Sequence, residues 1–324
     1  DINLTHAGTI TGATFALTIG GLGNGTLSSI LGTTTGILTK IGSGTWTLSG
    51  QSTFTGATTI ANGTLTLGAS GVATNSPLGT TGGATSIMTG AVLDFNGFTM
   101  STAEAIAING RGIGNGGALK GSSGTFSGVI TQGSDSRIVN GSGTMTISAA
   151  IGGAFNLYVS GSGNITTSAV FAASALSITK QGSGTFTVTG ANLYTGATRV
   201  DEGTFAYAAS TTLVATNLTV NGGTFNSGAN ADAIGTVTLV GGTIANSAAL
   251  TGTAYTLESG AVSGILAGAI AVTKNTNNTV NLTGVNTISS TLTINGGTVA
   301  LSGSGSAVSV TAITVNLGGT LTLD

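Results

Sequence analysis

Few side chains in this sequence have the types and spacing that acid–base or nucleophilic chemistry requires. His6 is the one histidine among 324 residues. A Ser-His-Asp triad needs an imidazole held between a carboxylate and the nucleophile. The stretch Gly133-Ser134-Asp135-Ser136 supplies a serine and an aspartate, but more than a hundred residues separate it from His6. Gly, Ser and Asp are turn-forming residues, so we expect a surface turn there.

A pair of carboxylates is the next chemistry to test. Glycoside hydrolysis uses two of them about 5 to 10 Å apart. Only Asp201 and Glu202 are adjacent among the internal acids, and neighbours along a strand point to opposite faces. We therefore expect a solvated turn at this pair. No catalytic residue is predicted, and the chain is interpreted as a non-enzyme. The internal acids are Asp94, Glu104, Asp135, Asp201, Glu202, Asp232 and Glu258.

Metal and cofactor sites are not indicated either. The chain has no cysteine, which removes thiolate ligands and disulfides. The glycine-rich stretches Gly21–Gly25 and Gly112–Gly116 lack the aspartate of calcium-binding solenoid repeats. Neither opens a helix that could hold a phosphate. We expect no metal and no cofactor.

The low charge content limits the classes of partner that this chain can bind. Charged residues make up 5% of the chain, against about 25% in ordinary domains, and the net charge is -2. Nucleic-acid binding needs a basic stripe, so that partner class is excluded. The most apolar stretch, Ala261–Val272, is too short for a membrane-spanning helix, which needs about 20 residues. We expect no transmembrane segment.

Any functional residue here must be positioned by repeats, which are the strongest signal in the sequence. Three ungapped segments of 31 residues align, and their apolar residues coincide: Leu38–Gly68, Ile178–Ala208 and Val272–Ser302. Within each segment apolar residues alternate with Thr, as in Trp46-Thr47-Leu48. This period of two predicts strands with an apolar inner face. The predicted core positions are Trp46, Leu48, Phe54, Ile60, Leu65, Phe186, Val188, Tyr194, Val200, Leu282, Ile288 and Ile294.

The spacing of a shorter motif indicates the length of one coil. Gly-Gly-Thr followed by an apolar residue recurs with gaps of about 20 residues, which fits one coil of a β-solenoid. The sequence therefore predicts an all-β, parallel β-solenoid of roughly 16 coils. It shows no linker, so residues 1–324 are interpreted as one continuous domain, with 71–174 the least regular part. The motif occurs at Gly222–Phe225, Gly241–Ile244, Gly296–Val299 and Gly318–Leu321.

The 31-residue segments resemble a known repeat. The match is carried by Lys40, Gly42, Gly44–Gly50, Thr53–Thr58 and Gly63–Leu67. This pattern is similar to the passenger-associated repeat of bacterial autotransporter proteins. The segment from Lys180 matches well and the one from Lys274 less so. The resemblance implies a right-handed β-helix exported to the exterior of a Gram-negative-type bacterium. Because the sequence begins at Asp1 without a charged-then-apolar leader, we expect its signal peptide to have been removed. It also implies that the repeat is scaffold.

Three of the four lysines occupy the same repeat position: Lys40, Lys180 and Lys274. One hypothesis makes them gatekeeper charges that keep a strand face soluble. The other makes them lateral contacts to a carboxylate of a neighbouring subunit. Both hypotheses place the ammonium groups on the outside.

We expect an extracellular structural β-solenoid that assembles with itself into a filament or forms an adhesive stalk. The segments Asn3–Thr11 and Val315–Asp324 look strand-like, so their edges could pair with another copy. The alternative is a monomeric released passenger that binds cell-surface or matrix glycans. Repeated Thr-x-Thr triplets, such as Thr45-Trp46-Thr47, leave ice binding as a third hypothesis.

Overall fold

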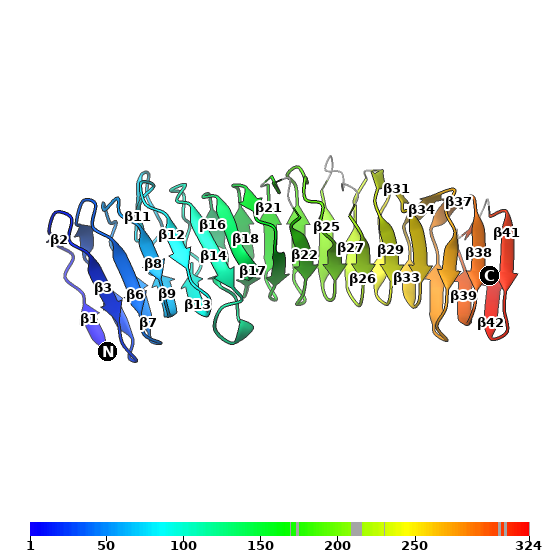
Figure 1. The fold of residues 1–324 in the computed structure, drawn as a ribbon, viewed down its shortest axis with the longest axis horizontal. Helices are drawn as coiled ribbons and strands as arrows, with labels where there is room; N and C mark the ends of the chain where they lie inside the picture. The colour runs from blue at the N-terminus through cyan, green and yellow to red at the C-terminus, as the bar shows by residue number, and fades with distance from the viewer. Residues whose placement is uncertain are drawn as a thin grey trace. The chain divides into compact units, whose positions relative to one another are not determined.

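The computed structural model describes residues 1–168, 170–172, 175–208, 216–229, 231–303, 306–307 and 310–323. The chain forms two compact units, Asp1–Ala172 and Ala173–Asp324. Strands make up nearly all of the regular structure in both units (Figure 1). Within the described residues the one helical element is the short 3-10 helix η1 (Ile113–Asn115). The all-β prediction is confirmed.

Unit 1, blue to green in Figure 1, stacks its strands in two long parallel columns. Column A consists of β1 (Ile2–Leu4), β4 (Gly25–Leu27), β7 (Thr45–Leu48), β9 (Gly63–Leu67), β13 (Ala91–Asp94), β15 (Leu119–Gly121), the second half of β17 (Ile130–Asn140) and β20 (Asn156–Ser160). Column B consists of β3 (Leu17–Gly20), β6 (Leu38–Ile41), β8 (Thr58–Ile60), β12 (Thr85–Ile87), β14 (Ile106–Gly110), the first half of β17 and β19 (Ile151–Gly152).

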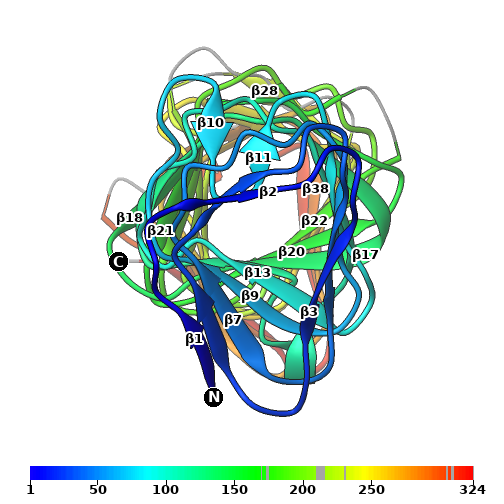
Figure 2. The same ribbon diagram turned by 90° about the vertical axis from the view of Figure 1, so that its left-hand side faces the viewer.

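Shorter strands complete the coils of unit 1. β2 (Thr9–Thr11) pairs with β5 (Ile30–Gly32), and β10 (Asn75–Ser76) forms an antiparallel hairpin with β11 (Gly79–Thr80). A third parallel column consists of β16 (Gly124–Phe126), β18 (Thr144–Ile147) and β21 (Asn164–Thr167). Viewed from the N-terminal end in Figure 2, the first coil runs clockwise as it recedes, so the solenoid of unit 1 is right-handed.

Unit 2, green to red in Figure 1, has three parallel columns. Column C consists of β22 (Ser177–Lys180), β24 (Thr198–Val200), β26 (Leu218–Val220), β29 (Thr236–Leu239), β32 (Ala254–Leu257), β35 (Val272–Lys274), β38 (Thr291–Ile294) and β41 (Ala312–Val315). Column D consists of β23 (Thr185–Val188), β25 (Thr204–Tyr207), β27 (Thr224–Asn226), β30 (Thr243–Ile244), β33 (Gly260–Val262), β36 (Thr279–Leu282), β39 (Gly297–Leu301) and β42 (Gly319–Leu323). Column E consists of β28 (Asp232–Ala233), β31 (Ala249–Thr251), β34 (Ile265–Gly268), β37 (Val285–Ile288) and β40 (Ser306–Ala307).

Alternation along each strand builds the core. In β7 the side chains of Trp46 and Leu48 are buried while Thr45 and Thr47 are half-buried on the outer face. Parallel pairing in register then stacks like on like, since Phe186 lies over Phe205 with ring centroids 5.2 Å apart. All twelve predicted core positions are buried. The two units together contain about 15 turns, close to the expected number.

The motifs fall where the pattern placed them. All four Gly-Gly-Thr motifs lead into strands of column D. The strand-like segments at the two ends contain β1 and β2, and β41 and β42. Asp324, the last residue of the second segment, lies outside the described residues, as does Ser174, the last residue of the range expected to be least regular. The single continuous domain stays a prediction.

Candidate functional site

The lysine of the first repeat lies inside the solenoid. Lys40 is in β6, stacked in register between Ile19 and Ile60, and its side chain is 0% exposed. Its Nζ donates to the carbonyl oxygens of Ile41 at 2.9 Å, at the end of β6, and of Gly42 at 2.8 Å, in the turn that follows. A third bond, of 3.0 Å, goes to the Asn62 carbonyl of the next coil. An ammonium has three donors, so the group is satisfied and joins two successive turns. We call this arrangement a lysine clip.

The repeat glycines make room for this clip. Gly63 has a φ of +70°, a conformation that favours glycine. A Cβ there would lie 2.7 Å from Lys40 Nζ and 2.4 Å from the Gly42 carbonyl oxygen. Gly203 in the second repeat has the same surroundings, with a φ of +62° and 2.7 Å to Lys180 Nζ. The spacing between the lysine and the later glycine of the repeat therefore follows from the contact between them.

The second clip repeats the first. Lys180 is 2% exposed, and its Nζ donates to the carbonyls of Gln181 at 2.8 Å, Gly182 at 2.5 Å and Glu202 at 3.3 Å. Burial lowers the pKa of Lys180 to about 8, and the negative charge of Glu202 opposes this shift. Burial also lowers the pKa of Lys40.

The lysine of the third repeat is also buried, but the bonds that its ammonium makes stay within its own turn. Lys274 is 0% exposed and its Nζ donates to the carbonyl and the hydroxyl oxygen of Thr276, the latter at 2.9 Å. The Glu258 carboxylate accepts from the backbone N–H groups of Asn275 and Thr276. Burial lowers the pKa of Lys274, and Glu258 opposes this. A carboxylate and a hydroxyl thus replace the glycine turn that the other two repeats use.

These positions correct the two hypotheses made for the lysines. Both required ammonium groups on the outer surface, and the structure buries all three residues. Their acceptors belong to the same chain, so the buried groups cannot pair with a carboxylate of a neighbouring subunit. The sequence contained the signal: Lys40 lies two residues after Leu38, which is an inward position. Alternation predicts the observed side, and the long aliphatic stem lets the charge reach the turn.

The surface turn expected at Gly133–Ser136 is wrong, because this stretch lies within strand β17 and Ser136 is buried. The adjacent acids Asp201 and Glu202 do lie in a turn. Asp201 accepts from Arg199 Nε at 2.6 Å and from Gln181 Nε2 at 3.2 Å. Glu202 accepts from the Gly182 N–H at 3.1 Å. His6 Nδ1 accepts from the Gly8 N–H at 2.9 Å in a turn of its own. These contacts tie the candidates to local structure in separate places.

Sequence reasoning missed the buried acid of unit 1. Glu104 is 1% exposed and accepts a hydrogen bond from the Thr85 hydroxyl at Oε1. Its Oε2 and the buried Thr102 hydroxyl have no partner. Burial raises the pKa of Glu104 to about 8, against the smaller opposing effect of Thr85. Alternation could have found it, because Glu104 has the same parity as the buried Ile106 and Ile108.

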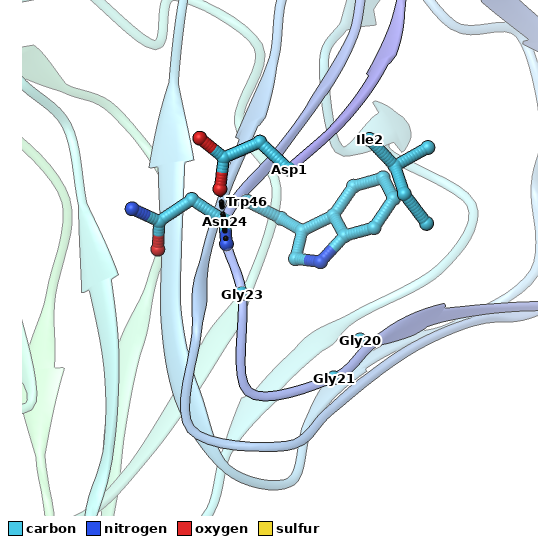
Figure 3. Close-up of a pocket in the computed structure, with 7 residues that line it drawn as sticks. All are labelled: Asp1, Ile2, Gly20, Gly21, Gly23, Asn24 and Trp46. Carbon is cyan, nitrogen blue, oxygen red and sulfur yellow. Dashed lines mark hydrogen bonds between the residues drawn. The ribbon is translucent and has the colours of Figure 1, made fainter.

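A cavity of about 240 Å³ lies at the first coil of unit 1 (Figure 3). Its lining residues are Asp1, Ile2, Gly20, Gly21, Gly23, Asn24 and Trp46. The Trp46 ring forms one wall, and Asp1 Oδ1 accepts from the Asn24 N–H at 3.1 Å. Trp46 Nε1 is buried without a partner. Backbone and three glycines form much of the wall, so the cavity offers few side chains for chemistry.

The Thr-x-Thr triplets form an array only two coils deep in unit 1. Thr45 and Thr47 of β7 pair in register with Thr64 and Thr66 of β9, and Val92 and Asp94 replace them on β13. Unit 2 has two longer files of single Thr residues, one along column D (Thr185, Thr204, Thr224 and Thr243) and one along column C. The members of the file along column C are Thr219, Thr238, Thr256, Thr273, Thr293 and Thr314.

Comparison with known proteins identifies two of the three repeats. The family model of the passenger-associated-transport-repeat matches residues 38–67 and 178–206. No curated protein and no solved structure matches the chain. In the part of the chain that the structure describes, no helix has the length and apolarity needed to cross a membrane. The two matched segments each contain one lysine clip, and the chain is therefore a β-solenoid that contains two passenger-associated transport repeats.

Proposed function

We propose that this chain is a non-enzymatic structural segment of an autotransporter passenger, displayed on the exterior of a Gram-negative-type bacterium. One observation carries the proposal: the residues that define the matched repeats are used inside the coils. The lysine, its glycines and the apolar positions all hold successive turns together. The outer faces of these repeats present mainly Thr, a surface suited to scaffold. The family match supports the surface location.

Surface display is tested on intact cells. The chain is expressed in its native passenger with an epitope inserted beside the exposed Leu193. We expect an antibody that cannot cross membranes to label intact cells as strongly as permeabilised cells. A matched epitope in a periplasmic protein serves as the control. Labelling only after permeabilisation would contradict the proposed location.

The finer part of the proposal is assembly of copies by coil stacking. The coil that holds β1 and β2 exposes Ile2, Leu4 and Leu22. The coil that holds β41 and β42 exposes Leu317 and Leu323. Each face also carries a parallel strand edge, which can continue the backbone ladder of a second copy. A low net charge limits repulsion between copies.

Sedimentation and electron microscopy over a range of concentrations test assembly. We expect linear assemblies of the chain and their loss in Leu22→Asp and Leu317→Asp. The matched control, Leu193→Asp, changes an exposed leucine away from both faces and should assemble normally. A chain that stays monomeric at all concentrations would remove filament formation and leave the alternative, a monomeric passenger that binds glycans.

A further inference from the structure

Two of the three arginines in the chain meet at one tyrosine of unit 1. The guanidinium carbon of Arg111 lies 3.9 Å from the ring centroid of Tyr158, and that of Arg137 lies 5.4 Å from it. Arg111 Nη2 also donates to the Tyr158 hydroxyl at 2.6 Å. We call Arg111, Arg137 and Tyr158 the arginine cluster. In a chain with so little charge, two cations at one ring need a specific explanation.

Strand register and an irregular loop build the cluster. Arg137 of β17 pairs in register with Tyr158 of β20, which places the two side chains on the same face. Arg111 comes from the preceding coil, where the register of β14 with β17 shifts between Ile108 and Gly110. Gly110, Gly112, Gly114 and Gly117 all have positive φ in this loop. The Gly117 N–H donates to the Arg111 carbonyl at 2.8 Å, so the loop folds back and holds Arg111 in place.

The cluster has more positive than negative charge. Asp135 is the carboxylate nearest to it, with Oδ2 3.6 Å from Arg111 Nη2, and it also accepts from the Asn156 N–H at 3.0 Å. Two guanidinium groups against one carboxylate leave a charge of +1. Burial lowers the pKa of Arg137, and so does the repulsion from Arg111, while Tyr158 opposes both. An anion beside the two arginines would relieve this repulsion.

A third cation of unit 1, Lys120, lies on the same face as the cluster. Lys120 of β15 pairs with Val139, two residues after Arg137, so the two cations lie on adjacent strands of one face. Apart from the buried Lys40, the lysines and arginines of unit 1 are Arg111, Lys120 and Arg137. Lys120 lies 4.0 Å from Asp94, which keeps the local net charge low. The Arg111 and Asp135 side chains are 35% and 51% exposed, so a ligand can reach them.

We propose that the arginine cluster binds an anionic group, a carboxylate or a sulfate ester, carried by an acidic polysaccharide. Guanidinium groups bind such oxyanions through paired hydrogen bonds. A net charge of +1 is too small for a nucleic acid, which needs many phosphate contacts. It suits a polymer with separated charges, because one cluster then meets one anionic group. The binding test uses purified protein, so its result is independent of the surface location proposed above.

Calorimetric titration of the purified chain at low and moderate salt tests the proposal. The probes are an oligogalacturonate, a sulfated oligosaccharide and a neutral glucan of equal length. We expect binding of one or both anionic probes, weakened by salt, and no binding of the neutral one. Preference for one anionic probe identifies the group. Equal binding of the neutral glucan, or no binding of either anionic probe, would overturn the proposal.

Substitutions locate the site. Arg111→Gln and Arg137→Gln should each raise the Kd about tenfold or more, whereas the matched control Arg199→Gln in unit 2 should leave it unchanged. Arg111→Lys keeps the charge without the paired donors and should show an intermediate loss. Asp135→Asn removes the internal counter-charge and should tighten binding at low salt. Unchanged affinity in both glutamine variants, with melting curves like the parent, would place any binding elsewhere and refute the assignment.

Discussion

Lys40 and Arg137 are both cations on strands of unit 1, but their surroundings are opposite. Lys40 has inward parity and lies in a matched repeat, where three carbonyls enclose its ammonium. Arg137 has outward parity and lies in the irregular coils, beside a second arginine and a tyrosine ring. Position in the alternation therefore decides whether a rare charge stabilises the fold or is available to a ligand. At these two positions, inward parity buries the charge and outward parity presents it.

The buried acid of the irregular coils gives the largest expected effect. The folded pKa of Glu104, about 8, lies above its ordinary value of 4.5. The folded state therefore holds the proton more tightly, and stability falls as pH rises from 4.5 to 8. The free energy of unfolding falls by an amount on the order of 5 kcal/mol. Urea unfolding followed by the fluorescence of Trp46, the one tryptophan and a residue of unit 1, measures it.

Glu104→Gln should abolish this pH dependence and make unit 1 more stable than the parent at pH 9. Asp135→Asn, which changes an exposed carboxylate, should keep the parental slope because Glu104 is still present. A slope that survives in Glu104→Gln would show that another group causes it.

In the Lys40 clip, we expect substitution of Gly63 to reduce stability more than substitution of the lysine. Gly63→Ala places a Cβ at a φ of +70° and 2.4 Å from a backbone carbonyl, so we expect a loss of about 3 kcal/mol. Gly90→Ala is the matched control, because Gly90 has a φ of +82° and nothing within 4 Å. The free energy of unfolding of this control should fall by only about 1 kcal/mol. Urea midpoints of the two variants make the comparison, and equal midpoints would remove the clip as the reason for Gly63.

Removing the ammonium should cost less than blocking its site. Lys40→Met keeps the aliphatic stem and leaves the carbonyls of Ile41, Gly42 and Asn62 without their donor. We expect a loss of about 2 kcal/mol. Lys120→Met on the outer face should stay within about 0.5 kcal/mol of the parent. If both variants unfold at the parental urea concentration, the Lys40 bonds contribute nothing net.

The smallest effect is the pH response of the second clip. The folded pKa of Lys180, about 8, lies below its ordinary value of 10.5. The folded state binds this proton less tightly, so the stability of unit 2 rises between pH 8 and 10.5, by about 1 kcal/mol after solvent screening. Hydrogen exchange of residues 198–207 reports it. Lys180→Met should remove the rise, and protection that falls with pH in the parent would contradict the sign.

The fold could be predicted because one rule repeats. Alternation of apolar residues with Thr placed Trp46, Phe186 and Leu282 in the core, and the same parity placed Lys40 and Glu104 inside. We assumed that charged residues are exposed, and this assumption prevented the burial of Lys40 and Glu104 from being predicted. The arginine cluster could not be predicted from the pattern. It depends on a loop with four positive-φ glycines and on a register shift, and neither follows from a period of two.

The Asn62 bond of the Lys40 clip gives the coil stack a direction. The ammonium binds its own turn and the turn of the later coil, through Ile41, Gly42 and Asn62. A polypeptide threaded through a pore with its later coils first would offer Lys40 and Lys180, on arrival, a turn that is already built. These two clips would then close on docking and oppose retraction of the chain. Threading in the other order would leave each of the two lysines one acceptor short until the next coil arrived.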